Sequence, residues 1–302
     1  MRIVFFGTPD FAAYSLRAII KAGFEVVGVV TAPDRPAGRG QKLQSSAVKQ
    51  AAQDLGLPLS QPEKLKNAEF LKQLEDWCPD LGVVIAFRML PEAVWSLPPM
   101  GTVNLHASLL PDYRGAAPIQ HAIINGESMT GLSTFKLVHE IDTGDILLQD
   151  EVAIEENETG GSLHDKLMVI GAQTMVNTLV SLRDQTDQPR TQEGSSTKMA
   201  PKLNRDFCCL HPESETAGQC ERKIRALSPY PGAWVKSSWG DVKIWASQKP
   251  EELPVGSTAG LLIEGKDLFL NCLQGRLRID SLQLPGKGRI QARDFINGLK
   301  AS

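Results

Sequence analysis

The chain is poor in cysteine, and its cysteines form no pattern that would support a disulfide framework or a metal site. They number five and are widely scattered, with no CxxC pair and no histidine at metal-ligand spacing. No apolar run approaches the ~18 residues that a membrane helix needs, and the opening residues 1–7 are too short for the apolar part of a signal peptide. We therefore expect a cytoplasmic protein with no bound metal and no membrane attachment.

The sequence also lacks the motifs of several large enzyme classes. Residues 6–11, Phe-Gly-Thr-Pro-Asp-Phe, follow an apolar stretch but lack the second and third glycines of a dinucleotide-binding GxGxxG turn. The chain contains no P-loop, no GxSxG and no HExxH. The chain thus lacks the residues that usually carry out hydride transfer, nucleotide hydrolysis, serine-based catalysis or zinc proteolysis. An α/β oxidoreductase stays open on topology alone.

Charge is modest and unevenly distributed. The 302 residues are 42% hydrophobic and 22% charged, which fits a globular chain of one large or two modest domains. The net charge is −3, but residues 201–302 hold 15 Lys and Arg against 11 Asp and Glu, so residues 1–200 hold 17 against 24. A basic C-terminal part permits a polyanionic partner, although the excess is too small to indicate one by itself.

Strand and helix patterns alternate through the first 182 residues. β-branched or continuously apolar stretches predict strands, and 3.6-residue periodicity predicts helices. The predicted strands are 2–6, 25–30, 80–86, 102–105, 132–137 and 146–154, and the predicted helices are 9–21 and 162–182. This order predicts an α/β fold with a Rossmann-like, doubly wound, mostly parallel sheet.

The composition changes after residue 182. Residues 184–198 are polar and nearly free of large apolar side chains, as in a linker. Beyond them lie short strand-like segments separated by glycine- or proline-containing turns, at 234–238, 242–246, 259–263, 268–272 and 277–282. We predict a first domain over 1–183, a linker over 184–206 and a small OB-like β-barrel domain over 207–302.

One polar pair at the end of a predicted strand indicates an active site. Asn104 and His106 lie two residues apart, so both side chains leave the strand on the same face, near the sheet edge where α/β folds bind ligands. An acidic segment at 139–145, which includes Asp142, lies between two later strands. Amide, imidazole and carboxylate together suit acyl transfer to an amine, which needs no serine nucleophile. A lone histidine at a strand end would more often be a hydrogen-bonded structural residue.

These residues carry a resemblance to a known family. The pattern Asn104-x-His106-x-Ser-Leu-Leu-Pro111, followed by Tyr-x-Gly and by Asp142 in Asp-Thr-Gly-Asp, resembles the signature of the folate-dependent formyltransferases. Segments 6–11, 32–40 and 114–120 are similar to the methionyl-tRNA formyltransferase family within that group. The resemblance extends over nearly the whole chain, including the linker and the second domain.

The resemblance implies a formyltransferase fold, a reaction and a site. The reaction is transfer of the formyl group of 10-formyltetrahydrofolate, a co-substrate, to the α-amine of methionyl initiator tRNA by a protein that we expect to be monomeric. Asn104 would polarise the formyl oxygen, His106 would move a proton, and Asp142 would complete proton transfer. The turn at the folate pterin would comprise Ser108, Leu109, Leu110 and Pro111.

The resemblance also implies tRNA contacts. The glycine-rich loop 33–43 carries Arg35, Arg39 and Lys42, which suit a phosphate or an opened acceptor stem. On composition alone this loop is an ordinary solvated surface segment. In the second part of the chain the candidate phosphate contacts are Lys202, Arg222, Lys223, Lys287 and Arg289.

The chain departs from the family pattern in two places. Where members carry Ala-Tyr-Gly before Leu-Pro, this chain has a segment one residue shorter, with Phe87, Arg88 and Met89, and this segment is expected to border the folate. If the position of Arg88 requires a positive φ, the loop is strained or reshaped. The second departure is Cys208-Cys209, which we interpret as buried apolar filling; a redox-labile or metal-binding pair is the alternative.

Two other functions remain open from the sequence. A formyltransferase acting on a small amine, such as glycinamide ribonucleotide or an amino-sugar nucleotide, would share the Asn, His and Asp set. A folate- or RNA-binding homologue without catalysis would fit the altered segment at Arg88, although the intact Asn104, His106 and Asp142 argue against it.

Overall fold

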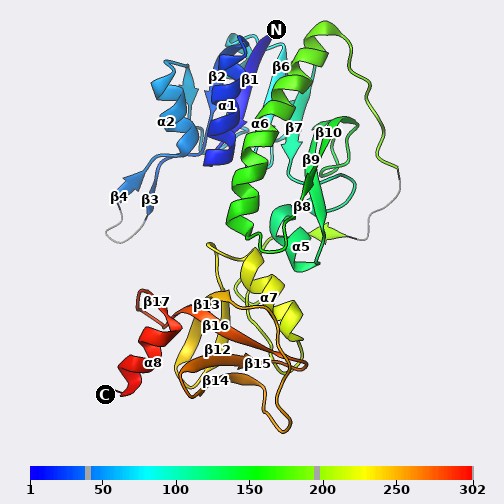
Figure 1. Cartoon of the computed structure of the whole chain (residues 1–302). Coiled ribbons are helices and arrows are strands. Elements are labelled where there is room, and N and C mark those ends of the chain that lie inside the picture. Colours follow the sequence, from blue (N-terminus) through cyan, green and yellow to red (C-terminus); the bar gives the residue numbers. More distant parts are fainter. Residues whose placement is uncertain (38–41, 194–197, 301–302) are drawn as a thin grey trace. The chain divides into compact units, whose positions relative to one another are not determined.

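The computed structural model describes residues 1–37, 42–193 and 198–300. The chain divides into two compact units, each assembled from three segments (Figure 1). The first unit comprises Met1–Gly115, Thr130–Val152 and Asp165–Lys198, and the second comprises Ala116–Met129, Ala153–His164 and Met199–Ser302. The chain therefore passes between the units more than once along its length.

The described part of the first unit is built on a seven-stranded sheet in the order β10-β9-β7-β6-β1-β2-β5. Its strands are β1 (Arg2–Gly7), β2 (Glu25–Val30), β5 (Leu59–Ser60), β6 (Leu81–Ile85), β7 (Thr102–His106), β9 (Met129–Lys136) and β10 (Ile146–Ala153). The pairs β1–β2, β1–β6, β2–β5 and β6–β7 are parallel, whereas β9 runs antiparallel to β7. The predicted α/β class with a mostly parallel sheet is confirmed.

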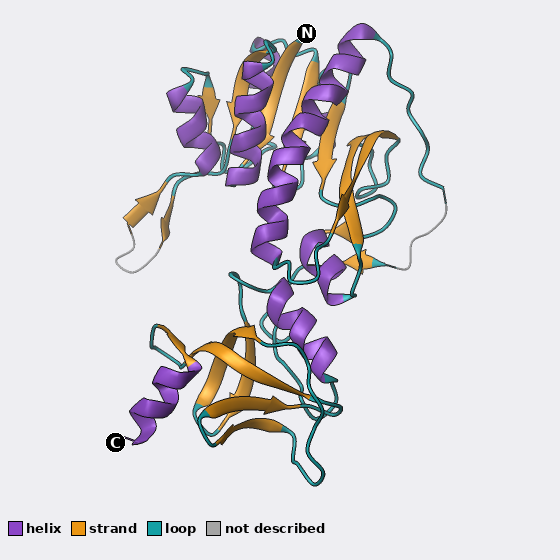
Figure 2. Ribbon diagram, viewed as in Figure 1, coloured by secondary structure: helices purple, strands orange, loops and turns teal. Residues whose placement is uncertain are grey.

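Helices cover both faces of this sheet (Figure 2). In β1, Val4 and Phe6 pack with Leu74 in a cluster that lies on one face, and the intervening Phe5 is also fully buried. Burial of both faces explains why the strand is continuously apolar. The described helices of this unit are α1 (Asp10–Lys21), α2 (Ala47–Asp54), α3 (Ala68–Asp76), α4 (Glu92–Trp95) and most of the long α6 (Gly160–Asp184), whose first residues belong to the second unit.

Only α1 and α6 correspond to helices predicted from the sequence, and among the helices that were not predicted, α2 and α3 begin with ordinary capping residues. The Ser46 hydroxyl accepts a hydrogen bond from the N–H of Lys49, and the Asn67 side chain accepts one from the N–H of Glu69. Both helices are short, 8 and 9 residues, so the apolar repeat in each is brief. The capping residues were the more informative signal.

The loop around residues 33–43 contains paired strands that the sequence analysis did not predict. Arg35–Ala37 (β3) runs antiparallel to Lys42–Gln44 (β4), with Pro36 opposite Leu43. This pairing fixes the described ends of the loop as a two-stranded ribbon, with Arg35 exposed at its start.

The second unit is centred on a curled antiparallel sheet, which confirms the predicted barrel-like fold. The order is β12-β13-β16-β15-β14, with β17 paired to β16. Its strands are β12 (Ala233–Ser237), β13 (Gly240–Ser247), β14 (Gly260–Glu264), β15 (Asp267–Asn271), β16 (Arg276–Gln283) and β17 (Arg289–Gln291). The second unit also contains β11 (Met199–Ala200), α5 (Pro118–Ile124), α7 (Ala217–Ala226) and α8 (Ala292–Lys300), whereas the short β8 (Arg114–Gly115) belongs to the first unit.

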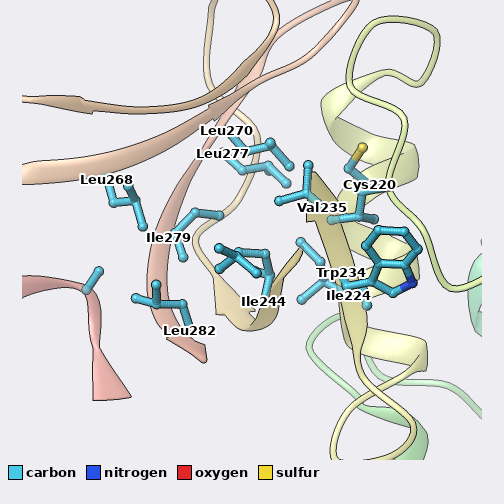
Figure 3. Packing of buried hydrophobic residues seen from close by; sticks show 14 of the residues in the cluster. Cys220, Ile224, Trp234, Val235, Ile244, Leu268, Leu270, Leu277, Ile279 and Leu282 are labelled. Carbon is cyan, nitrogen blue, oxygen red and sulfur yellow. The ribbon is translucent and has the colours of Figure 1, made fainter. Parts of the chain in front are cut away.

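The inner face of the curled sheet packs against α7 in one apolar cluster (Figure 3). Ile244, Leu268 and Leu277 of the sheet are fully buried, and Ile224 of α7 packs in the same cluster. Alternate residues of each strand point inward, which produces the short alternating pattern seen in the sequence. Among the residues described, no helix is both long and apolar enough to cross a membrane.

Candidate active site

The polar pair predicted from the sequence lies on β7, where parallel and antiparallel pairing meet. Asn104 is opposite Val84 of the parallel strand β6 and opposite Phe135 of the antiparallel strand β9. His106 ends the strand and is 8% exposed, whereas Asn104 is half-buried. No hydrogen bond links the Asn104 side chain to another described residue. The amide is thus an available hydrogen-bond donor at the carboxyl edge of the strand.

The hydrogen bond to His106 determines which ring nitrogen can act as a base. Nε2 of His106 lies 2.9 Å from the backbone oxygen of Tyr113. Because a carbonyl oxygen only accepts, Nε2 must carry a hydrogen, and a neutral imidazole then has a bare Nδ1. Nδ1 lies 3.9 Å from Oδ2 of Asp142. The site therefore presents a proton-accepting nitrogen opposite a carboxylate.

Asp142 is held in place through its backbone and its side chain. Its φ of 55° lies in the left-handed region, which Asp tolerates better than most residues. Its Oδ2 accepts a hydrogen bond from the N–H of Gly115 at 3.0 Å. Two residues later, a Cβ on Gly144 would lie 1.7 Å from the backbone oxygen of Lys136, so only glycine fits there. The turn is thus pressed against the end of β9.

Gln192 is a residue of this site that sequence reasoning missed. Its Nε2 donates to the backbone oxygens of Asp142 at 3.0 Å and Gly144 at 2.8 Å. Its Oε1 accepts from the guanidinium of Arg114, at 2.6 Å from Nη2. One side chain from the segment expected to be a linker therefore fastens both sides of the Asp142 turn to Arg114. A glutamine within a polar stretch carries no sequence signal for such a role.

The predicted folate turn is internally hydrogen-bonded. The Ser108 hydroxyl donates to the backbone oxygen of Asp112 at 2.6 Å, and the Ser133 hydroxyl donates to the backbone oxygen of Ser108 at 2.7 Å. Ser133 also accepts from the N–H of Leu110, and the Leu110–Pro111 peptide is cis. Ser108 and Leu110 are buried, so their hydroxyl and N–H hold the shape of the turn.

Leu109 of the same turn packs on a glycine of β9. A Cβ on Gly131 would lie 2.4 Å from a methyl carbon of Leu109 and 2.2 Å from the backbone oxygen of Asp150. The absence of a side chain at residue 131 is what lets the turn approach the sheet.

The segment 86–91 differs from the expectation of strain at Arg88. The left-handed backbone falls on Ala86, at φ 46°, and Arg88 is not among the residues with positive φ. The Arg88 guanidinium donates to the backbone oxygens of Pro62 and Glu63, and its carbon lies 5.6 Å from the centre of the Phe87 ring. Partial burial and the nearby charge of Arg35 lower the pKa of Arg88. Arg88 therefore needs no positive φ, and its hydrogen bonds secure the segment against residues 62 and 63.

Phe87 and Met89, the neighbours of Arg88 in this segment, both leave part of their surface accessible. The Phe87 ring centre lies 6.1 Å from that of Phe6, and Met89 is 74% exposed. A cleft of about 510 Å³ lies at the segment that Arg88 binds, and its lining residues are Glu63, Lys64, Lys66 and Asn67.

The predicted tRNA contacts have different environments. Arg39 lies outside the described residues, as does the side chain of Lys42, whereas Arg35, Lys202 and Lys287 are exposed. The expectation for Lys223 is wrong. It is 8% exposed, and its Nζ donates to the backbone oxygen of Cys209 at 2.6 Å and pairs with Glu215 at 2.9 Å.

Two further expectations concern residues near Lys223. Arg222 is half-buried, and its Nε donates to the backbone oxygen of Ile124 at 3.0 Å. Cys208 and Cys209 are buried, and this burial raises the pKa of both thiols. The interpretation of the two cysteines as buried filling is confirmed.

Relatives match the chain from end to end. A methionyl-tRNA formyltransferase of Bacteroides thetaiotaomicron is 44% identical over 315 residues, covering 100% of this chain and 97% of its own. Two family models match, one described as formyl transferase over residues 1–179 and one as formyl transferase, C-terminal domain, over residues 202–300.

Solved structures share the fold at lower identity. An N-formyltransferase from Helicobacter canadensis, in complex with folinic acid and dTDP-3-aminofucose, is 17% identical with a TM-score of 0.64, covering 92% of this chain and 98% of its own. HypX from Aquifex aeolicus, in complex with tetrahydrofolic acid, is 19% identical with a TM-score of 0.65. That likeness covers 98% of this chain, which spans about half the length of HypX, 47%. From the two family models and the end-to-end relative, we conclude that this chain belongs to the formyl transferase family.

Proposed function

We propose that this chain transfers the formyl group of 10-formyltetrahydrofolate to the α-amine of methionyl initiator tRNA, giving N-formylmethionyl-tRNA. The observation that carries the proposal is the end-to-end relationship to methionyl-tRNA formyltransferases, with Asn104, His106 and Asp142 placed together in the first unit. The folate donor is consistent with the folates named in the solved relatives. We propose that the protein works in the cytoplasm as a monomer.

The proposed reaction forms one C–N bond and breaks another. The methionyl amine attacks the formyl carbon, the carbonyl oxygen gains negative charge, and the bond from that carbon to N10 of the folate then breaks. One proton leaves the amine and one arrives at N10, so the reaction is redox-neutral and needs no oxidant. The site must therefore stabilise an oxyanion and carry a proton from one nitrogen to the other.

The side chains of the site match these two tasks. The Asn104 amide, which no described residue engages, would donate to the developing oxyanion. The bare Nδ1 of His106 would take the proton of the amine and return it to N10. Protonated His106 would face Asp142, whose Oδ2 already accepts from Gly115, so the carboxylate would stabilise the imidazolium. The 3.9 Å between Nδ1 and Oδ2 is longer than a hydrogen bond, so the carboxylate would leave the bare Nδ1 available to the amine.

The remaining assignments extend the proposal over the chain. We assign folate binding to Ser108, Leu109, Leu110, Pro111, Phe87, Arg88 and Met89, and tRNA binding to Arg35, Arg39, Lys42, Lys202 and Lys287. The catalytic domain would comprise 1–183, the linker 184–206 and the tRNA-binding domain 207–302. Arg88, already engaged with backbone oxygens, would act by keeping Phe87 and Met89 at the folate.

The test is formyl transfer from 10-formyltetrahydrofolate to four acceptors in parallel: methionyl initiator tRNA, methionyl elongator tRNA, free methionine and glycinamide ribonucleotide. We expect rapid transfer to the initiator alone. Transfer only to glycinamide ribonucleotide would keep the chemistry and overturn the tRNA substrate, and no transfer to any acceptor would overturn the proposal.

A further inference from the structure

Gln149, a half-buried residue of β10, hydrogen-bonds to three other segments of the first unit. Its Nε2 donates to the backbone oxygen of Leu110 at 3.0 Å and to the hydroxyl of Ser133 at 2.8 Å. Its Oε1 accepts from the guanidinium of Arg190. The side chain therefore connects the predicted folate turn, strand β9 and the segment that was expected to be a linker.

The partners of Gln149 require an amide at this position. The Leu110 oxygen only accepts hydrogen bonds, whereas the Arg190 guanidinium only donates them. The side chain between them must therefore donate on one side and accept on the other. A glutamate would accept from Arg190 but would place a carboxylate oxygen against the oxygen of Leu110. Packing within the strand makes no such demand, because half-buried strand positions readily accept β-branched and aromatic side chains.

The contacts of Gln149 reach the interior of the predicted folate turn. Ser133 is fully buried, and its hydroxyl donates to the backbone oxygen of Ser108 and accepts from the N–H of Leu110. Gln149 supplies a second donor to this hydroxyl and a donor to the carbonyl of Leu110, a residue that is 3% exposed. Loss of the amide would take hydrogen bonds from buried acceptors, which is costly enough to shift the turn.

Arg190 contacts β10 twice, and both contacts support Leu110. Its backbone N–H donates to the oxygen of Ile146 and its backbone oxygen accepts from the N–H of Ile146, both at 2.8 Å. The Ile146 side chain is buried in one apolar cluster with Leu110. The Arg190 guanidinium fixes Gln149, which binds the Leu110 oxygen. A residue from the polar stretch thus secures both side chains of β10 that hold Leu110.

The side-chain contacts of this stretch go beyond what is needed to attach it to the sheet. The backbone pairing with Ile146 already joins residue 190 to β10. The additional contact of Arg190 leads through Gln149 to the predicted folate turn, and Gln192, two residues later, donates to backbone oxygens of the Asp142 turn. Both side chains therefore act on turns that carry residues of the candidate site.

We propose that Gln149 and Arg190 are positioning residues for folate binding: Gln149 holds the turn 108–111 in the shape that receives the folate, and Arg190 acts through Gln149. The proposal rests on the proposed function, because it takes this turn as the folate site. It separates two roles within one stretch of the chain. Arg190 governs the affinity for the folate, whereas Gln192 governs the placement of Asp142.

The experiment measures the Kd of folinic acid, the folate in one of the solved relatives, by calorimetry on the full chain, together with formylation kinetics. Gln149→Ala should raise this Kd and the KM for 10-formyltetrahydrofolate about tenfold, as for one or two hydrogen bonds, with kcat at saturating folate and the KM for tRNA unchanged. Gln149→Glu, which keeps the size of the side chain and the acceptor for Arg190, should be impaired as much. Arg190→Ala should raise the Kd about threefold, and combining it with Gln149→Ala should add nothing further.

Two matched controls should leave the Kd of folinic acid unchanged. Arg183→Ala removes an exposed guanidinium that is hydrogen-bonded to Asp184, and Glu151→Gln changes an exposed side chain of β10. Arg190 is itself exposed, so its variant keeps the test standing if the Gln149 variants fold poorly.

The outcomes separate this proposal from the proposed function. A wild-type Kd in the Gln149 and Arg190 variants would overturn the positioning role, as would a fall in kcat with no change in the folate Kd. A wild-type protein that binds folinic acid but formylates no tRNA would overturn the proposed function instead, and the folate Kd of the variants would still decide the role of Gln149.

Discussion

His106 faces Asp142 through Nδ1 while its Nε2 is held by the backbone oxygen of Tyr113. This relationship makes the imidazole a base on one side only, because the hydrogen bond to a carbonyl fixes the tautomer. The 3.9 Å from Nδ1 to Oδ2 exceeds the length of a hydrogen bond, so the carboxylate does not occupy the bare Nδ1. In the proposed reaction, this arrangement would move the proton without a nucleophilic side chain.

The first prediction concerns Asn104 and His106. Asn104→Ala removes an oxyanion donor, and we expect kcat to fall by roughly 10² to 10³. His106→Ala removes the base, and we expect a loss of roughly 10² to 10⁴. Both variants should keep the wild-type circular dichroism and tRNA affinity, since neither residue is assigned to tRNA binding. Activity within tenfold of the wild type in either variant would refute the role assigned to that residue.

The second prediction concerns Gly144, whose added Cβ would lie 1.7 Å from the backbone oxygen of Lys136. Gly144→Ala must displace the turn that carries Asp142, so we expect kcat to fall by about tenfold or more, because a misplaced catalytic group is costly. Gly298→Ala is the matched control, since its Cβ would meet no atom of the described residues within 4 Å. Equal activity of the two variants would show that the turn tolerates the displacement.

The sequence predicted the strands of the candidate site better than the side-chain contacts that fix the turn at Asp142. β2, at Glu25–Val30, has the predicted bounds, and β7 is one residue longer than predicted, because buried parallel strands leave continuous apolar runs. The two-residue spacing predicted that Asn104 and His106 lie on one face of a strand, and β7 carries both. Gln192 could not be predicted, because its role depends on backbone oxygens of a turn 50 residues away. The expectation that Lys223 contacts a phosphate failed because its charge is paired within the fold with Glu215. Glu215 is eight residues away in the chain, and the sequence around Lys223 does not reveal this pairing.

The third prediction tests Gln192 as a positioning residue. Gln192→Ala removes both hydrogen bonds to the Asp142 turn and the acceptor for Arg114, so we expect kcat to fall about tenfold with little change in the KM for tRNA. Gln192→Glu keeps the acceptor for Arg114 and loses the donors, and its activity should lie near that of the alanine variant. Gln173→Ala, which changes an exposed side chain that donates to Asn177 and to no other described residue, serves as the control. A Gln192→Ala enzyme with the pH–rate profile and kcat of the wild type would rule out this role.

The last prediction concerns the pH dependence of stability in the second unit, where Glu215 pairs with the buried Lys223. Burial alone would raise the pKa of Glu215, but hydrogen bonds from the N–H of His211 and from Lys223 outweigh it, so the pKa is lowered from 4.5. A lowered folded pKa means that the unfolded chain binds the proton more readily, so the stabilisation is complete above about pH 4.5 and is lost as the pH falls through the lower folded value. Glu215→Gln should lower the free energy of unfolding by about 3 kcal/mol at neutral pH, because it leaves Lys223 without its ion-pair partner. Thermal melts should also show that the melting temperature of the variant changes less between pH 3 and 5 than that of the wild type. A variant whose melting temperature falls with acid as steeply as that of the wild type would show that other carboxylates dominate the transition.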